Sequence, residues 1–302
     1  MIPVLPEAEW TAQRAAHVDR IDRLIGGYLA ERARGARHPV LDFLFTYYSF
    51  KPGHLERWGP GHGVALAGDR ARDYAGFASY EEVRTSAGSA YRVRRSLLDQ
   101  RRSAIEFTLG LLTATRSRQP NFGCFGLHEW AMVYRGGRRA LRHGSVPLRL
   151  GHEGTDEVVD SMKLRCTHYD AFRFFTPEAA PRNALPLDPA ARTDSEQPGC
   201  VHASMDLYKW SYKLAPLVES GLVADCFELA LSAREVDMRA SPYDLTDYGL
   251  EPIAIETPAG RAEYVRAQTD LTARADPLRS ELIARCENLL VSGGAIAGLT
   301  AE

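Results

Sequence analysis

Apolar residues recur at spacings of three and four in several stretches of the chain, which is the period of an amphipathic helix. The clearest example near the N-terminus is residues 21–29, where Ile, Leu and Tyr alternate with charged residues. The same period predicts helices over residues 95–115, about 204–218, about 223–236 and 259–291. Pro277 lies inside the last of these segments, and we expect it to break or kink that helix.

Patterns typical of strands are scarce. Residues 43–49 (FLFTYYS) are rich in residues that favour strands, but a wholly buried helix would have the same composition. The segment 177–198 contains five prolines, which predicts a long loop. We therefore expect a mainly α protein, a compact multi-helix assembly with few or no strands. It forms either one domain over residues 1–302 or two packed helical lobes over residues 1–150 and 151–302.

The composition is that of an ordinary globular protein, with 302 residues and 45% hydrophobic residues. The five cysteines include no C-x-x-C pair, and the first residues, MIPVLPEAEW, lack the basic and apolar regions of a secretory leader. These features favour a cytoplasmic protein with free thiols. No apolar run approaches the roughly 20 residues that a membrane span needs, so we expect no membrane partner.

The net charge of −2 conceals an uneven distribution. Residues 1–150 contain 23 Lys and Arg against 14 Asp and Glu, whereas residues 151–302 contain 14 against 25. The basic excess is concentrated in residues 84–149, which contain thirteen Arg and three acidic residues. Such a segment is suited to an anionic partner such as DNA, or to packing against the acidic half of the chain.

Histidines next to acidic residues are the most informative feature for chemistry. Four such pairs occur among apolar and aromatic residues: His38 with Asp42, His128 with Glu129, His168 with Asp170, and His202 with Asp206. Helical proteins use imidazole and carboxylate groups on facing helices to bind transition metals. One hypothesis is therefore a metalloenzyme, such as a non-haem iron oxidoreductase, that acts on a small molecule with Fe or another transition metal held by His128, Glu129, His168, His202 and Asp206. The alternative is that each pair only orients an imidazole or satisfies a buried polar group.

Carboxylates can also act without a metal. Hydrolysis of a glycosidic bond needs a carboxylate that stabilises a cationic sugar centre and activates water, and Asp170, Asp206 and Asp237 are the candidates for this catalytic role. Neighbouring aromatic and cationic residues would bind a planar or anionic substrate: Arg173, Tyr208, Lys209, Trp210 and Arg239. The alternative is that the aromatic residues are core and the cations form internal ion pairs.

Five strings of sequence contain these residues: HPVLDFLFTYYSFKPGHLERWGPGHG, FGCFGLHEWAMVYR, LRCTHYDAFRFFTPEAAPRN, CVHASMDLYKWSYKLAPLV and ADCFELALSAREVDMRASPYDL. In these strings, and over most of its length from about Trp10, the chain resembles a group of actinobacterial proteins of similar length described as 3-methyladenine DNA glycosylases. The resemblance implies a DNA repair hydrolase that removes an alkylated purine such as 3-methyladenine without a cofactor. It also implies DNA as the partner, bound through the Arg-rich segment 84–149.

Overall fold

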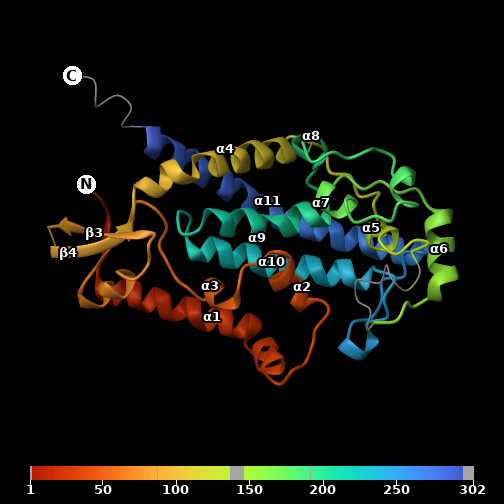
Figure 1. Cartoon of the computed structure of the whole chain (residues 1–302), viewed down its shortest axis with the longest axis horizontal. Helices are drawn as coiled ribbons and strands as arrows, with labels where there is room; N and C mark the ends of the chain where they lie inside the picture. Colours follow the sequence, from red (N-terminus) through yellow and green to blue (C-terminus); the bar gives the residue numbers. More distant parts are fainter. Residues whose placement is uncertain (1, 87, 137–145, 191, 295–302) are drawn as a thin grey trace.

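The computed structural model describes residues 2–86, 88–136, 146–190 and 192–294. The molecule is elongated, and its long helices run along the longest axis (Figure 1). These are α1 (Glu7–Ala33), α4 (Ser96–Arg116), α9 (Val201–Leu214), α10 (Ser220–Arg239) and α11 (Pro258–Gly294). The mainly α architecture predicted from the hydrophobic period is confirmed.

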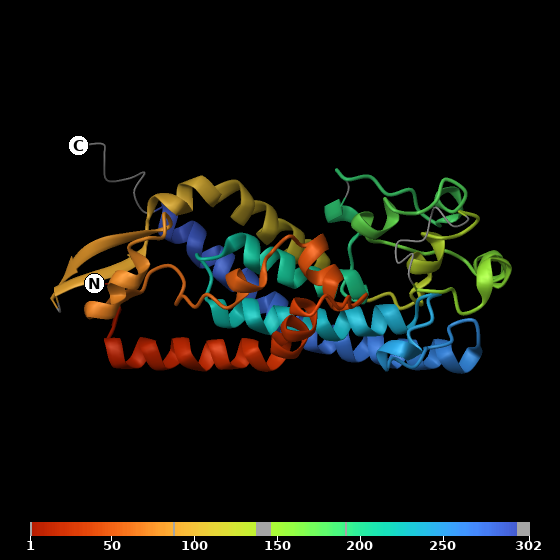
Figure 2. The ribbon, with the colours of Figure 1, turned by 60° about the horizontal axis from the view of Figure 1, so that its bottom comes forward.

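Helix α9 lies at the centre of this arrangement. All but two of its fourteen residues are buried, and it packs on α10, α11 and α4 (Figures 1 and 2). Because it is enclosed on all sides, α9 buries polar residues as well as Met205, Leu207 and Tyr208. One continuous hydrophobic core contains residues from both halves of the chain, from Trp10 to Leu289.

A small four-stranded sheet lies at one end of the molecule, next to the start of α1 (Figures 1 and 2). Its order is β1-β2-β4-β3, with β1 (Val4–Leu5) parallel to β2 (Ala65–Ala67) and the other pairs antiparallel. Strands β3 (Tyr80–Thr85) and β4 (Gly88–Val93) are the longest. The indole of Trp10 donates a hydrogen bond of 2.9 Å to the carbonyl of Ala67, which fastens α1 to the sheet.

The ambiguous and irregular segments resolve as follows. Residues 43–49 belong mostly to a helix, α2 (Leu41–Tyr47), whose Leu44 and Phe45 are buried. Helix α11 continues through Pro277 without a break. In the described part of segment 177–198 the chain is irregular apart from two short helices, η3 (Ala180–Arg182) and α8 (Arg192–Ser195). The remaining short helices connect the long ones: α3 (Pro52–Leu55), η1 (Asp69–Tyr74), α5 (Leu127–Ala131), α6 (Gly151–Ser161), α7 (Tyr169–Phe172) and η4 (Thr246–Tyr248).

The basic and acidic halves of the sequence form ion pairs with each other. Arg149 makes a two-pronged pair with Glu256, at 2.6 and 2.9 Å. On α1, Arg20 lies 2.7 Å from both Asp225 and Glu228 of α10. Part of the opposite charge of the two halves is therefore neutralised inside the molecule.

The arginines of segment 84–149 are spread along the length of the molecule. Arg92 on β4 pairs with Glu81 at the sheet end, whereas Arg149 precedes α6 at the opposite end (Figure 1). Between them, Arg101 of α4 donates a hydrogen bond to the carbonyl of Lys213. Arg138, Arg139 and Arg142 lie outside the described residues. In the described part of the chain, no helix is long and apolar enough to cross a membrane.

Shortening a fully buried side chain of α9 tests the central position of this helix. Leu207→Ala is expected to lower the free energy of unfolding by about 2–5 kcal/mol, because the side chain is 0% exposed and its loss leaves a cavity. The matched control is Val291→Ala on α11, where the side chain is 73% exposed and a change within about 0.5 kcal/mol is expected. Urea denaturation measures both, and equal stability of the two variants would contradict the packing described.

Candidate functional site

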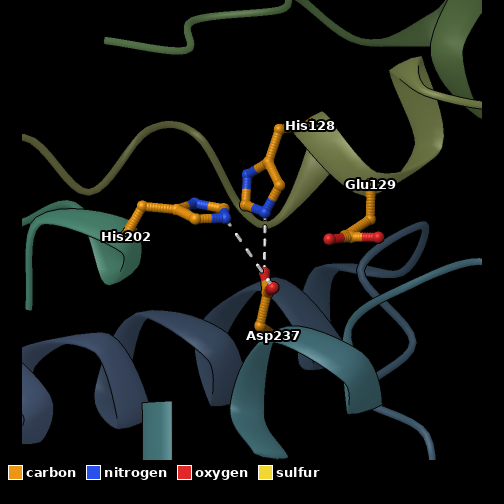
Figure 3. A group of neighbouring side chains, drawn as sticks. All are labelled: His128, Glu129, His202 and Asp237. Atoms are coloured by element: carbon orange, nitrogen blue, oxygen red, sulfur yellow. Dashed lines mark hydrogen bonds and ion pairs between the residues drawn. The ribbon is translucent and has the colours of Figure 1, made fainter. Parts of the chain in front are cut away.

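Four ionisable side chains from three helices converge near the end of the molecule opposite the sheet. His128 and Glu129 come from α5, His202 from the first turn of α9, and Asp237 from the last turn of α10 (Figure 3). We call these residues the tetrad: His128, Glu129, His202 and Asp237. All four are buried, and one ligand atom of each lies within 4.8 Å of the others.

The turn before α5 positions the helix so that His128 and Glu129 lie in the tetrad. Gly126 precedes the helix with a φ of 74°, a conformation that suits glycine. A Cβ atom at this position would lie only 3.1 Å from the Cβ of Ala240, so glycine also permits close approach to the end of α10. This contact brings α5 against the turn that carries Asp237.

Asp237 is the centre of the tetrad. Its Oδ1 lies 2.6 Å from Nε2 of His128, and its Oδ2 lies 4.0 Å from Nε2 of His202. Figure 3 shows the two imidazoles pointing at this carboxylate from different sides, with Glu129 beside them. The rings of His128 and His202 are edge to face, with centroids 4.4 Å apart.

Arg234 joins the two carboxylates of the tetrad. It lies one helical turn before Asp237 on α10, and its Nη1 is 2.8 Å from Oδ2 of Asp237 and 3.1 Å from Oε1 of Glu129. The guanidinium packs on the ring of Phe43, with its central carbon 3.9 Å from the ring centroid. A buried cation therefore neutralises part of the negative charge and fixes the orientation of both carboxylates.

Burial and neighbouring charges shift the pKa values in opposite directions. For Asp237, burial favours the neutral acid, but the stronger combined effect of His128, His202 and Arg234 holds its pKa below the ordinary value. For His128, burial lowers the pKa and Asp237 more than reverses this, so its pKa is raised well above the ordinary value. Burial, together with the charge of His128, lowers the pKa of His202 well below the ordinary value. The tetrad thus contains one imidazole that favours the charged form and one that favours the neutral form.

A second buried network adjoins the tetrad, and we call it the lysine network: Lys209, Asp170, Asp206, His168 and Glu196. The ammonium of Lys209 donates hydrogen bonds of 2.6 Å to Asp170 and 2.8 Å to Asp206. Nε2 of His168 lies 3.3 Å from Asp206 and 3.5 Å from Glu196. The ring of His168 stacks on that of His202, with centroids 5.2 Å apart, so the two clusters are in contact.

Two further side chains hold the aspartates of the lysine network. The hydroxyl of Tyr48 donates a hydrogen bond of 3.0 Å to Asp206, and Arg192 donates one of 2.8 Å to Asp170. Burial disfavours the charged form of both carboxylates, but Lys209 outweighs it and lowers the pKa of each below the ordinary value. Both aspartates are therefore carboxylates at neutral pH.

A cavity of about 570 Å³ gives both clusters access to a ligand. The tetrad contributes Glu129 and His202 to its wall, and the lysine network contributes Asp170. The remaining lining residues are mainly aromatic or apolar: Arg37, Pro39, Asp42, Phe43, Thr46, Tyr47, Met132, Ala171, Phe174, Arg234 and Tyr248. The arrangement is that of many ligand sites, in which an apolar pocket contains a few convergent polar groups.

The structure divides the predicted metal ligands into two groups. His128, Glu129 and His202 come together in the tetrad, whereas His168 and Asp206 belong to the neighbouring lysine network. Asp237, predicted as a catalytic carboxylate, completes the tetrad. Of the three predicted catalytic aspartates, Asp170 lines the cavity, and Asp206 and Asp237 lie behind its wall.

The predicted substrate-binding residues lie outside the cavity lining. Tyr208 and Trp210 are 0% and 4% exposed in the core, and Lys209 is engaged by two aspartates. Arg239 pairs with Glu263 at 3.1 Å, and Arg173 lies 3.6 Å from Asp170 and packs on Phe174. These placements match the alternative of core aromatics and internal ion pairs.

Sequence reasoning missed Arg234, Glu196 and Tyr48. Arg234 had a usable signal, because it precedes Asp237 by three residues, a spacing that places the two side chains on one face of a helix. Glu196 lies at the end of a proline-rich segment, and no local pattern marks it as a buried residue.

Comparison of the chain with protein-family models, with curated proteins and with solved structures finds no match.

Replacing the lysine of the second network tests its charge balance. Lys209→Met leaves two buried carboxylates without their shared cation, and we expect the free energy of unfolding at pH 7 to fall by about 3–5 kcal/mol. Lys213→Met is the matched control, because Lys213 lies one turn further along α9 and makes no ion pair within the described residues. An equal decrease in the free energy of unfolding in the two variants would contradict a specific role for Lys209.

The same substitution has a predictable pH dependence. Since the folded-state pKa values of Asp170 and Asp206 are depressed, both groups stabilise the native protein above their unfolded pKa, and this contribution is lost as pH falls through the folded values. Lys209→Met loses the main cause of this depression, so the stability difference from the parent protein should shrink as pH is lowered below about 4. Chemical denaturation between pH 3 and pH 7 measures this difference, and a constant difference would contradict the assignment.

Proposed function

We propose that the cavity is the active site of a metal-dependent enzyme acting on a small molecule, with a transition metal bound by the tetrad. The observation that carries this proposal is the convergence of two imidazoles and two carboxylates, with ligand atoms within 4.8 Å of one another. Two of the four residues, Glu129 and His202, line a cavity of about 570 Å³. Each ligand atom lies about 2 Å from a bound transition metal, so the donor atoms of one site must lie within a few ångström of one another, as those of the tetrad do.

The donor set supports a borderline metal and favours iron. Nitrogen from two histidines with carboxylate oxygen suits Fe(II), Mn(II), Co(II) or Zn(II), and two histidines with one carboxylate form the facial set typical of non-haem Fe(II) oxygenases. His128, His202 and Asp237 supply this set, with Glu129 as a further oxygen donor. A metal here would supply Lewis acidity or redox chemistry to a molecule in the cavity.

Arg234 is compatible with a bound metal. It contacts Oδ2 of Asp237 and Oε1 of Glu129, whereas His128 faces Oδ1 of Asp237. If a metal were held by the tetrad, the guanidinium would remain an outer hydrogen-bond partner that orients both carboxylates. His128 and Asp237 would move apart by a few tenths of an ångström, because two ligands of one metal lie about 3 Å apart. The metal would also displace the proton that His128 carries.

Metal analysis tests the proposal. Protein purified without an affinity tag should contain transition metal in near-stoichiometric amount, or should take up one Fe(II) or Mn(II) per chain after treatment with EDTA. His128→Gln and Asp237→Asn each remove one donor, and each should weaken binding by about 100-fold or more, since loss of even an outer partner typically costs about 10–100-fold. Isothermal titration calorimetry measures these affinities.

The control is His152→Ala, which removes an exposed histidine on α6 and should leave metal affinity unchanged. Glu129→Gln and His202→Gln provide a second pair of tetrad variants if one of the first pair does not fold by circular dichroism. Absence of metal uptake by the parent protein, or equal affinity in folded tetrad variants, would refute the metal site.

A second candidate function is hydrolysis of the bond between base and sugar, as the resemblance to 3-methyladenine DNA glycosylases implies. The observation favouring it is that Asp170 lies at the wall of a cavity that also contains Phe43, Tyr47, Phe174 and Tyr248. Aromatic side chains of this kind hold an extruded base, and a carboxylate kept ionised by Lys209 would stabilise a cationic sugar centre.

Activity on alkylated DNA distinguishes the two candidate functions. If the glycosidic function is correct, EDTA-treated protein releases free 3-methyladenine from methylated duplex DNA at low salt, and Asp170→Asn lowers this rate by at least about 100-fold. The control is Asp160→Asn, which alters an aspartate on α6 outside the cavity lining. Methylated DNA that the parent protein leaves intact would eliminate this candidate.

A further inference from the structure

The charged groups that line the cavity are almost all compensated. Glu129 pairs with Arg234, and Asp170 pairs with Lys209 and Arg192. Asp42 lies 3.8 Å from Arg32 and also accepts a hydrogen bond of 2.8 Å from the hydroxyl of Tyr28. The negative groups of the wall are therefore already satisfied.

Arg37 is the exception. It lines the cavity from the connection between α1 and α2, and its side chain is exposed. Among the lining residues that the structure describes, it is the one charged side chain for which neither an ion pair nor a hydrogen bond is found. A cation at this position can bind an anionic group of a ligand without first breaking an internal ion pair.

The cavity that Arg37 lines also has walls suited to an aromatic ring. Phe43 and Tyr47 stack on each other with centroids 4.8 Å apart and planes 8° apart, and Phe174 and Tyr248 complete the aromatic lining. Burial raises the pKa of Tyr47 to about 12, so its hydroxyl is neutral at physiological pH and adds no negative charge. Aromatic rings pack on such surfaces in offset or edge-to-face geometry.

We infer that the cavity binds a small aromatic carboxylate, with the ring against Phe43 and Tyr47 and the carboxylate on Arg37. This inference names the substrate class of the proposed enzyme and so rests on the proposed function for its biological meaning.

Three compounds of one shape provide the test: 3-phenylpropionate, 3-phenylpropionamide and 3-phenylpropylamine. Binding to EDTA-treated protein is measured by calorimetry or ligand-observed NMR, so that a metal cannot attract the carboxylate. We expect the carboxylate to bind about tenfold more tightly than the amide, since a charged hydrogen-bond partner is roughly twice as strong as a neutral one, and the amine to bind most weakly.

Two arginine variants test whether Arg37 causes the preference for the carboxylate over the amide. Arg37→Met should abolish the tenfold preference for the carboxylate and leave the amide affinity unchanged. Arg34→Met is the matched control: Arg34 lies three residues away, pairs with Glu31 and does not line the cavity, so the preference should persist. The inference is overturned if the carboxylate does not bind at millimolar concentration, if the amide or amine binds as tightly, or if Arg37→Met retains the preference.

Failure of this inference is distinguishable from failure of the proposed function. A carboxylate preference that depends on Arg37 in a protein that takes up no metal supports the ligand class and refutes the metal site. Stoichiometric metal uptake without a carboxylate preference supports the metal site and overturns the ligand class.

Discussion

The ionised carboxylate of Asp237 imposes the strongest constraint on this fold. The side chain is 0% exposed, and an unpaired charge in such an environment costs several kcal/mol. Helix α10 supplies one partner from its own preceding turn, Arg234, but a second must come from elsewhere in the chain. That requirement brings α5 and its His128 against the end of α10, where Gly126 permits the close contact. The part of the cavity wall formed by Glu129, His202 and Arg234 thus depends on neutralising one buried charge.

Helix α9 contributes buried charged groups to both the tetrad and the lysine network. His202, Asp206 and Lys209 follow one another at spacings of four and three, so they lie along one face of the helix. His202 belongs to the tetrad, Asp206 and Lys209 belong to the lysine network, and the stacked rings of His168 and His202 join the two. Buried polar groups need partners, and these come from distant parts of the sequence: Tyr48 bonds to Asp206 of α9. Arg192 in turn pairs with Asp170 and lies near Glu196.

The long helices could be predicted because their apolar period extends over many residues, as in α1, α4 and α11. Strands β1 and β2 could not, since they are two and three residues long and strands so short show no alternation. In the site, proximity in sequence identified His128 with Glu129, and helical spacing identified His202 with Asp206. Neither signal specifies which helix faces which, so the separation of His168 from the tetrad and the addition of Asp237 depended on tertiary packing.

The asymmetry of charge between the two halves of the chain has a structural use. Arg20 on α1 pairs with α10, Arg149 pairs with Glu256, and in the opposite sense Glu129 of the basic half pairs with Arg234 of the acidic half. Each pair crosses between the halves, so opposite net charges favour their association. The buried clusters show the same balance: in the tetrad, two carboxylates oppose Arg234 and a protonated His128. Because that balance includes one removable proton, the tetrad can exchange it for a cation, whereas the lysine network, neutralised by Lys209 and Arg192, has its main cations fixed in covalent side chains. For this reason we propose the metal in the tetrad rather than in the adjoining lysine network.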